Sequence, residues 1–372
     1  MSRPQIIVRI EAALTRRGAP TATGTAFMAY AGATGPTTPL RCISSADALA
    51  ANVPAATAAL IGDALEQGVP EVYVVKSATT DPATTTEEQW TTALALFDDS
   101  YGPGQALIPG VSTSAAHTAL LDHSDALGRC VLLDGANNAT ASVLAAAATA
   151  LADADGAERA GFIAPWVTVP AAGGATREVP GSVIAAGLAA RGDGVVGHAN
   201  HAPAGDQGRG AGLVRRGLDV TTKFTTAELD SLHDAGVSVI RPVRGAPTLY
   251  GWRSISSDDR FRQLNVGRMS MQLATGIQAG GEAFLFRNID GEGRLFAELE
   301  GFLRGYLQPL WTAGALFGAT ADDAFDVQVV DVNTLTTITA GELHSLVGAT
   351  LTPHAEKVYF DVVTRTPEGA AA

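Results

Sequence analysis

The sequence predicts a doubly wound, mainly parallel α/β sheet in the N-terminal half and a helix-rich α+β domain in the C-terminal half. Between residues 40 and 165, short apolar segments alternate with segments of helical periodicity. This alternation is typical of parallel sheets with helices on their faces. Two long amphipathic segments dominate the C-terminal third. A chain of 372 residues also exceeds the usual size of a single core, which favours two domains.

The N-terminal half divides into short strands and capped helices. Short apolar runs rich in Val, Ile, Leu and Cys predict strands at 40–43, 71–76, 105–109, 130–134 and 161–166. Segments of helical length between these strands predict helices at 45–67, where a Ser/Asp cap marks the start, and at 86–97, 114–127, 139–152 and 180–190.

The C-terminal half contains fewer strands and longer helices. A Thr225 cap precedes a predicted helix at 226–234. The helix predicted at 258–279 places Val266, Met269 and Leu273 on one face, as an amphipathic helix requires. The remaining predicted elements are strands at 237–242, 283–287 and 325–332, and a second long helix at 293–316.

Both ends of the chain have the period-two pattern of a β-strand. At the N-terminus Ile6, Val8 and Ile10 share one face of the predicted strand, and at the C-terminus Val358, Phe360 and Val362 do so. Neither strand has an obvious hairpin partner, and unpaired strand edges are costly to bury and hazardous to expose. We therefore expect extended β-arms that pair with a neighbouring subunit. The predicted units are 1–20 and 355–372 as arms, with 21–224 and 225–354 as domains.

Charge and hydropathy exclude several function classes. The chain has 38 acidic and 25 basic residues and a net charge of −13, so it repels phosphate backbones and nucleic acid is not expected as a partner. No apolar run approaches the roughly 18 residues that span a bilayer, so we expect synthesis in a cytoplasm and no direct membrane contact. Cys42 and Cys130 are predicted to be buried free thiols.

One segment resembles the nucleophile elbow of a serine hydrolase. Ser112 follows the predicted strand 105–109 and precedes a predicted helix, which is the context that exposes a catalytic serine. Asp134 or Asp193, and then His198 or His201, would follow it in the hydrolase order of serine, acid and histidine. However, Ser114 stands where the elbow needs glycine, and Ser112 is an equally good helix cap. A serine hydrolase is the alternative function.

Two other segments have the composition of ligand sites without their context. His198 and His201, flanked by Asp193 and Asp206, lie three residues apart in a Gly/Ala/Pro loop, whereas a catalytic zinc site needs helical spacing and a third ligand. The glycines at 208–212 follow no strand and open no capped helix, so they do not form a phosphate-binding loop. We expect no metal, no cofactor and no catalytic residue.

Seven segments of the C-terminal half together resemble a known family. In chain order they are 191–205 (RGDGVVGHANHAPAG), 225–229 (TTAEL), 235–241 (AGVSVIR), 249–256 (LYGWRSIS), 262–268 (RQLNVGR), 284–288 (FLFRN) and 310–318 (LWTAGALFG). Their order and spacing resemble the C-terminal half of contractile-tail sheath proteins, which occur in phages, R-type bacteriocins and related injection particles.

The resemblance implies a structural protein and not an enzyme. Such a subunit polymerises helically around an inner tube and contracts to drive the tube through a target envelope. Its implied partners are other copies of itself, the inner tube protein, the baseplate and the tail terminator. The particle would be a virion tail or a related contractile particle, assembled in the cytoplasm of a host bacterium. A non-contractile shell or scaffold protein is the third alternative.

The resemblance also implies which surface faces the tube. Residues 21–224 would be the outer and central domain, and 225–354 the inner domain that faces the tube. The candidate tube contacts on the predicted helix 258–279 and its start are Arg260, Arg262, Arg268 and Gln272. Arginine pairs well with acidic partner surfaces. The chain departs from the family at Gly267-Arg268, where two adjacent basic residues are common.

Overall fold

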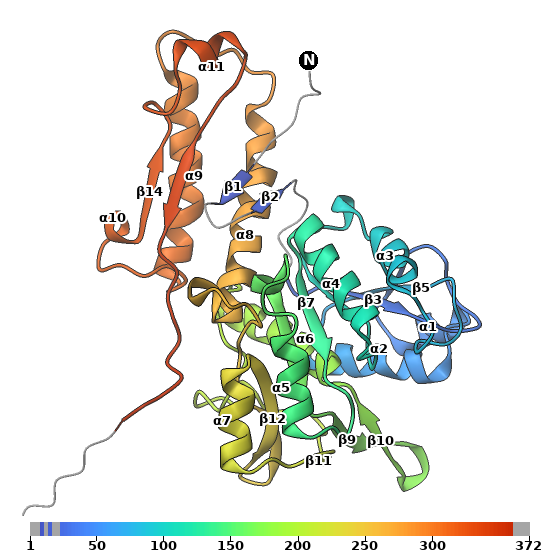
Figure 1. Cartoon of the computed structure of the whole chain (residues 1–372). Coiled ribbons are helices and arrows are strands. Elements are labelled where there is room, and N and C mark those ends of the chain that lie inside the picture. Colours follow the sequence, from blue (N-terminus) through green and yellow to red (C-terminus); the bar gives the residue numbers. More distant parts are fainter. Residues whose placement is uncertain (1–7, 11–13, 17–22, 360–372) are drawn as a thin grey trace, which may run out of the picture.

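A single eight-stranded sheet organises most of the chain. The computed structural model describes residues 8–10, 14–16 and 23–359. The strand order is β13-β12-β8-β7-β6-β3-β5-β4, in which the six inner strands are parallel and both edge strands are antiparallel to their neighbours (Figure 1). The strands are β3 (Ala26–Tyr30), β4 (Leu40–Cys42), β5 (Val72–Lys76), β6 (Gln105–Leu107), β7 (Cys130–Asp134), β8 (Ala160–Ala164), β12 (Val237–Val243) and β13 (Ala246–Leu249). The predicted mainly parallel sheet is confirmed.

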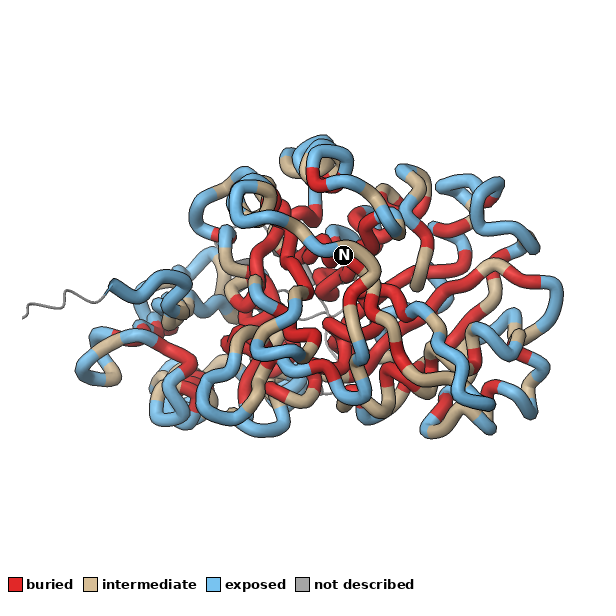
Figure 2. The backbone as a smooth tube through the Cα atoms, turned by 90° about the horizontal axis from the view of Figure 1, so that it is seen from below, coloured by how far each residue is buried: buried red, intermediate tan, exposed pale blue. Residues whose placement is uncertain are grey.

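Helices pack on both faces of this sheet. One core contains side chains of α1 (Ser45–Ala50), α2 (Ala55–Gln67) and α6 (Gly181–Val196). The other contains side chains of α3 (Glu87–Ala95), α4 (Ser114–Leu127), α5 (Ala141–Thr149) and α7 (Thr226–Asp234). Buried backbone is concentrated in the interior and exposed backbone surrounds it (Figure 2).

Strand β3 lies inside the sheet, although the sequence analysis assigned no strand there. All five of its residues are buried, with Ala26 and Met28 facing one core and Phe27 and Ala29 facing the other. A strand buried on both faces shows no polar alternation, and this one has no β-branched residue, so both sequence signals are absent.

The C-terminal part builds a second, smaller core on a helical hairpin. Helices α8 (Leu264–Gly281) and α9 (Arg294–Thr312) lie side by side (Figure 1). The buried leucines of α9 recur every three or four residues, as an amphipathic helix requires. They pack with α10 (Ala321–Ala324) and with the two-stranded sheet of β14 (Phe325–Gln328) and β15 (Leu346–Ala349). Helix α11 (Leu335–Thr339) lies between these two strands in the chain.

Two glycines set how closely α8 and α9 approach. A Cβ atom at Gly276 would lie 2.1 Å from the Tyr306 hydroxyl, and one at Gly280 would lie 2.0 Å from the Phe302 ring. Any larger residue at either position would force the facing ring of Tyr306 or Phe302 to move. The aromatic rings of α9 therefore pack directly on the backbone of α8.

Several predicted boundaries are wrong. The helix predicted at 45–67 is two helices, because Pro54 lacks the N–H that a continuous helix needs and α2 begins directly after it. The strand predicted at 283–287 is the 3₁₀ turn η5 (Glu282–Phe284) followed by a loop, since its apolar residues meet no strand edge. Strand β14 ends at Gln328, before the predicted end at 332.

The expected domain boundary between 224 and 225 also cuts through the large sheet. Helix α7 and strands β12 and β13 follow that point, yet β12 pairs with β8 and α7 contributes Leu232 to the sheet core. The second core begins within α8, where Met269 and Leu273 join it. The pairing of β12 with β8 joins segments that are distant in the chain, and no local sequence pattern indicates such a pairing.

The terminal strands differ from expectation where they can be compared. Strand β1 (Val8–Ile10) pairs with β2 (Leu14–Arg16) as an antiparallel pair and lies against α8, so the expectation that it lacks a partner within the chain is wrong. An alternating pattern indicates a strand without specifying its partner. Val358 is 67% exposed and belongs to no strand of the described chain. Ile6, Phe360 and Val362 lie outside the described residues.

Two further expectations concern membranes and thiols. Among the residues the structure describes, none of the helices combines the length and hydropathy needed to cross a bilayer. Cys42 and Cys130 are both buried and free, and burial raises the pKa of each thiol to about 11. Such thiols are protonated near neutral pH and therefore weakly reactive.

The buried His117 should make stability fall in mild acid. Its ring packs edge-on against Phe162 at 5.6 Å, its Nε2 lies 3.1 Å from the Asp134 carbonyl, and burial lowers its pKa to about 4. An unfolded imidazole titrates near pH 6.5, so between about pH 6.5 and pH 4 the unfolded chain binds more protons and the free energy of unfolding decreases as pH falls.

Urea unfolding of the wild type and of His117→Gln isolates this contribution. Between about pH 7.5 and pH 4.5 the wild type should lose about 2 kcal/mol more than the variant, because only the wild type has this histidine to protonate. Equal losses in the two proteins would contradict the assignment.

Candidate functional site at the junction of the two cores

Helix α8 belongs to both cores of the molecule. Its first residue, Leu264, packs in the sheet core, whereas Met269 and Leu273 pack in the second core. Twelve of its 18 residues are buried. The polar side chains at its N-terminal end are therefore removed from water and need partners within the protein.

A buried ion pair fixes α8 to the sheet domain. The Arg268 side chain is fully buried and forms a bidentate pair with Asp193 of α6, at 2.6 Å and 3.0 Å. The Thr23 hydroxyl donates a third hydrogen bond to the same carboxylate at 2.6 Å. Burial alone would lower the pKa of Arg268, but the attraction of Asp193 outweighs it and the pKa is raised. The arginine therefore remains charged inside the protein.

Two buried asparagines, Asn200 and Asn265, form a second set of polar contacts at the start of α8. Asn265 donates to the Asn200 carbonyl oxygen at 2.5 Å, and Asn200 donates to the main-chain carbonyls of Ala315 and Thr352 at 2.6 Å and 3.0 Å. Both asparagines are buried. This amide chain joins α8, the loop after α6 and the segment that follows β15.

The loop after α6 makes two more contacts with the second core. Gln272 of α8 accepts a hydrogen bond from the Ala199 N–H at 2.7 Å. The His198 Nε2 lies 3.2 Å from the Ala313 carbonyl oxygen, beyond the end of α9. The segment around 197–201 is thus a structural joint between the two cores.

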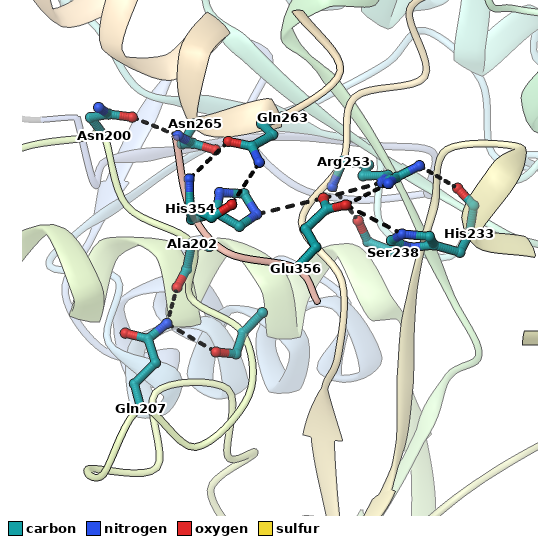
Figure 3. Close-up of polar contacts among 11 residues, drawn as sticks. Asn200, Ala202, Gln207, His233, Ser238, Arg253, Gln263, Asn265, His354 and Glu356 are labelled. Carbon is teal, nitrogen blue, oxygen red and sulfur yellow. Dashed lines mark hydrogen bonds and ion pairs between the residues drawn. The ribbon is translucent and has the colours of Figure 1, made fainter. Parts of the chain in front are cut away.

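A third set of contacts anchors the segment that leads to the C-terminus. Gln263 and the main chain of His354 exchange two hydrogen bonds, at 2.9 Å and 3.0 Å (Figure 3). The Arg253 guanidinium holds the Glu356 carboxylate through two nitrogens, and His233 lies 3.4 Å from the same carboxylate. Arg253 itself is positioned by Ser238, whose hydroxyl accepts from its main-chain N–H at 3.0 Å.

These contacts favour ionised Glu356. Hydrogen bonding from His233 and then from Arg253 outweighs the opposing effect of burial and holds the pKa of Glu356 well below its usual range. Burial lowers the pKa of His354 beside it. From Ala355 to the end of the described chain every residue is exposed, with Tyr359 at 83%. We call residues 350–356 the arm anchor.

Three residues considered for the hydrolase triad, Asp134, Asp193 and His198, make structural contacts instead. The Asp134 carboxylate accepts from the main-chain N–H groups of Gly110 and Ser182 and from the Ser182 hydroxyl. Asp193 holds Arg268, and His198 contacts Ala313. Ser112 is exposed, and Thr113 is the residue that caps α4. None of these groups is hydrogen-bonded to Ser112 in the described part of the chain.

The two ligand-like segments also have structural roles. Within the described ranges, no group of three or more His, Cys, Asp or Glu residues is arranged to hold a metal ion. In the glycine-rich loop, Asp206 accepts from the Gly210 N–H at 3.0 Å and so closes the loop on itself.

The predicted tube-contact residues separate into two groups. Arg260 and Arg262 have exposed side chains, at 70% and 58%, and lie at η4 (Asp259–Phe261), ahead of α8. Arg268 is fully buried, so its prediction as a surface contact is wrong for this structure: helical spacing placed it on the helix but did not indicate which face is covered. Gln272 is half-buried and held by Ala199.

The departure from the family pattern at Gly267 has a steric reason. A Cβ atom there would lie 2.3 Å from the Glu158 carbonyl oxygen, so α8 approaches the chain ahead of β8 too closely for any side chain. A second basic residue does not fit at this position.

Comparison with known proteins identifies structures that share this fold. No protein-family model and no curated protein matches the sequence. Solved structures do match, and they show that the chain has the fold of contractile-particle sheath proteins. The predicted resemblance to that family is therefore confirmed as a shared fold.

Three of these structures illustrate the match. The helical sheath of the anti-feeding prophage in the contracted state is 20% identical, with a TM-score of 0.73 over 98% of this chain and 99% of that one. The contracted sheath complex of PVC, an extracellular contractile injection system, is 18% identical, with a TM-score of 0.73 over 98% of both chains. A sheath tail protein from Desulfitobacterium hafniense is 12% identical, with a TM-score of 0.60 over 84% and 92%.

Removing the charge of Asp193 should destabilise the whole chain. Asp193→Asn leaves Arg268 buried without its counter-charge, which costs about 3–5 kcal/mol of unfolding free energy. Asp219→Asn is the matched control, because Asp219 pairs with Lys223 on the surface, and its loss should cost about 0–1 kcal/mol. Denaturant unfolding measures both. Equal, small costs for the two variants would show that the buried pair does not hold the junction.

Proposed function

We propose that this chain is a structural subunit of a contractile sheath. In this role it polymerises helically around an inner tube and contracts to drive the tube through a target cell envelope. The observation that carries the proposal is the correspondence of nearly the whole chain, 98% of it, to nearly the whole of each contractile-system sheath. Both cores and the junction between them lie within the matched length.

The proposed partners follow from that role. They are other copies of this chain, an inner tube protein, a baseplate and a tail terminator, in a virion tail or related particle assembled in a bacterial cytoplasm. The role needs no catalysis, and the commitment of Asp134, Asp193 and His198 to structural contacts supports it. A hydrolase or a closed shell is less well supported.

We propose that the terminal arms link subunits by strand addition. Sheet β14–β15 has only two strands in the described chain, so each strand has an open edge, and such a sheet is marginal alone. A strand added to either edge gains main-chain hydrogen bonds. The arm anchor supports this proposal, because it fixes residue 356 and leaves Val358 and Tyr359 exposed for another subunit.

The proposed tube contact is now limited to Arg260 and Arg262 at η4, ahead of α8. Arg260 and Arg262 are exposed and each already pairs with a neighbouring aspartate, Asp258 or Asp259. Exposed pairs are worth about 0–1 kcal/mol, so these arginines can exchange partners at little cost. Repetition along a helical lattice adds many such small contributions.

Truncation tests the arms. Deleting residues 1–15 or 357–372 should leave a folded, soluble subunit that no longer forms long tubes, because both deletions keep the arm anchor, the eight-stranded sheet and sheet β14–β15. Deleting only 367–372, beyond the alternating pattern, is the control and should leave tubes intact. Circular dichroism checks folding and negative-stain microscopy measures tube length. Normal tubes from either arm deletion would refute intermolecular pairing by that arm.

Charge reversal tests the tube contact. Arg260→Glu together with Arg262→Glu should yield empty sheath polymer when the subunit is assembled with its tube protein, and added salt should weaken wild-type tube binding similarly. Arg41→Glu with Lys223→Glu reverses two comparably exposed charges elsewhere and should have no effect. Micrographs give the fraction of tube-filled particles. Wild-type filling and salt tolerance in the first variant would place the tube contact elsewhere.

A further inference from the structure

The two faces of the eight-stranded sheet domain carry cavities of opposite charge. A cavity of about 330 Å³ lies beside α6 and is lined by three arginines, Arg191, Arg209 and Arg215. A cavity of about 610 Å³ lies between α3 and α4 and is lined by three aspartates, Asp98, Asp99 and Asp122. Helix α6 packs on one face of the sheet, and α3 and α4 pack on the other.

Contacts within the chain hold two arginines of the first cavity, Arg191 and Arg215, in place. No acidic residue lines it. Arg191 is fixed by donating to the main-chain carbonyls of Ala211 and Leu213, at 3.1 Å and 2.9 Å. Arg215 is held on α2, since its main chain exchanges two hydrogen bonds with Gln67. Three like charges thus converge on one space in a protein whose net charge is −13.

A buried histidine in the same cavity lacks a partner. His201 is 8% exposed and lines the cavity, and its Nε2 has no hydrogen-bond partner among the described residues. Burial, followed by repulsion from Arg268, lowers its pKa to about 4, so the ring is neutral. Buried polar atoms of this kind are usually paired.

The aspartate-lined cavity has the complementary chemistry. Its buried lining is mainly apolar, with Leu94 and Ala119 beside His123, and the carboxylates of Asp99 and Asp122 form no salt bridge in the described chain. Arg129 lies beneath, but its guanidinium is buried and donates to three main-chain carbonyls. An apolar floor with acidic edges suits the long stem and charged head of arginine.

We propose that the exposed charged rims of these two cavities dock onto each other between copies of this chain. Asp99 and Asp122 of one copy meet Arg209 and Arg215 of the next. Because the cavities lie on opposite faces of the sheet domain, the contact is heterologous, and a heterologous contact that does not close produces an open helical filament. The inference rests on the proposed sheath function and specifies one lateral contact of its polymer.

A charge swap tests the docking. Arg209→Glu and Asp99→Lys alone should each lower the polymerised fraction of the full-length chain several-fold at low salt, because each places like charges together. The double variant Arg209→Glu/Asp99→Lys should recover most of it. Lys223→Glu and Asp230→Lys are exposed controls on or near α7 and should polymerise as the wild type does. Sedimentation measures the polymer, and thermal melting confirms folding.

The outcomes separate the inference from the proposed function. If the wild type forms tubes and both single reversals do so equally, the docking is refuted while the sheath function stands. If both single variants lose polymer and the double variant does not recover, the cavities bind different partners and the docking is again refuted. If the wild type forms no polymer under any condition, the proposed function itself fails.

Discussion

The buried pair between Arg268 and Asp193 is the interaction on which the rest of the structure depends. Helix α8 must serve two hydrophobic cores, so its first turns are covered by the sheet domain and its last turns by α9. A charged side chain in that position is stable only with a well-oriented counter-charge. Asp193 supplies it, and Thr23 completes the coordination of the carboxylate. The amides of Asn200 and Asn265 then extend the same polar joint to the C-terminal segment.

This joint determines where the chain leaves the folded subunit. The arm anchor is tied to the sheet domain through Arg253 and to the start of α8 through Gln263. Its position is therefore coupled to both cores. An arm that starts from a rigid point can remain bound to a neighbour while the subunits change orientation, and backbone hydrogen bonds tolerate such rigid-body motion. In a contractile lattice, this combination keeps subunits connected while their other contacts rearrange.

The sequence predicted the parallel sheet and most of its helices because apolar periodicity and capping residues are local signals. It missed β3, which is buried on both faces and lacks β-branched residues. The boundary predicted between residues 224 and 225 falls within the large sheet, because pairing of β12 with β8 joins segments more than 70 residues apart. At the junction, Arg268 was predicted as a tube contact and His198 was weighed as a triad or zinc residue, and the partners that the structure gives them were not identified. Which face of a helix is covered depends on the tertiary fold. The sequence around Arg268 therefore could not show that this side chain is buried.

The most direct measurement is cryo-electron microscopy of the purified full-length chain under conditions that favour assembly. The account predicts helical tubes in which residues 358–364 of one subunit lie as a strand against the open edge of sheet β14–β15 in a neighbour. Arg268 and Asp193 should remain paired within each subunit. Monodisperse particles or closed shells would contradict the sheath assignment. Tubes whose terminal strands pair only within their own subunit would contradict the proposed role of the arms in linking subunits.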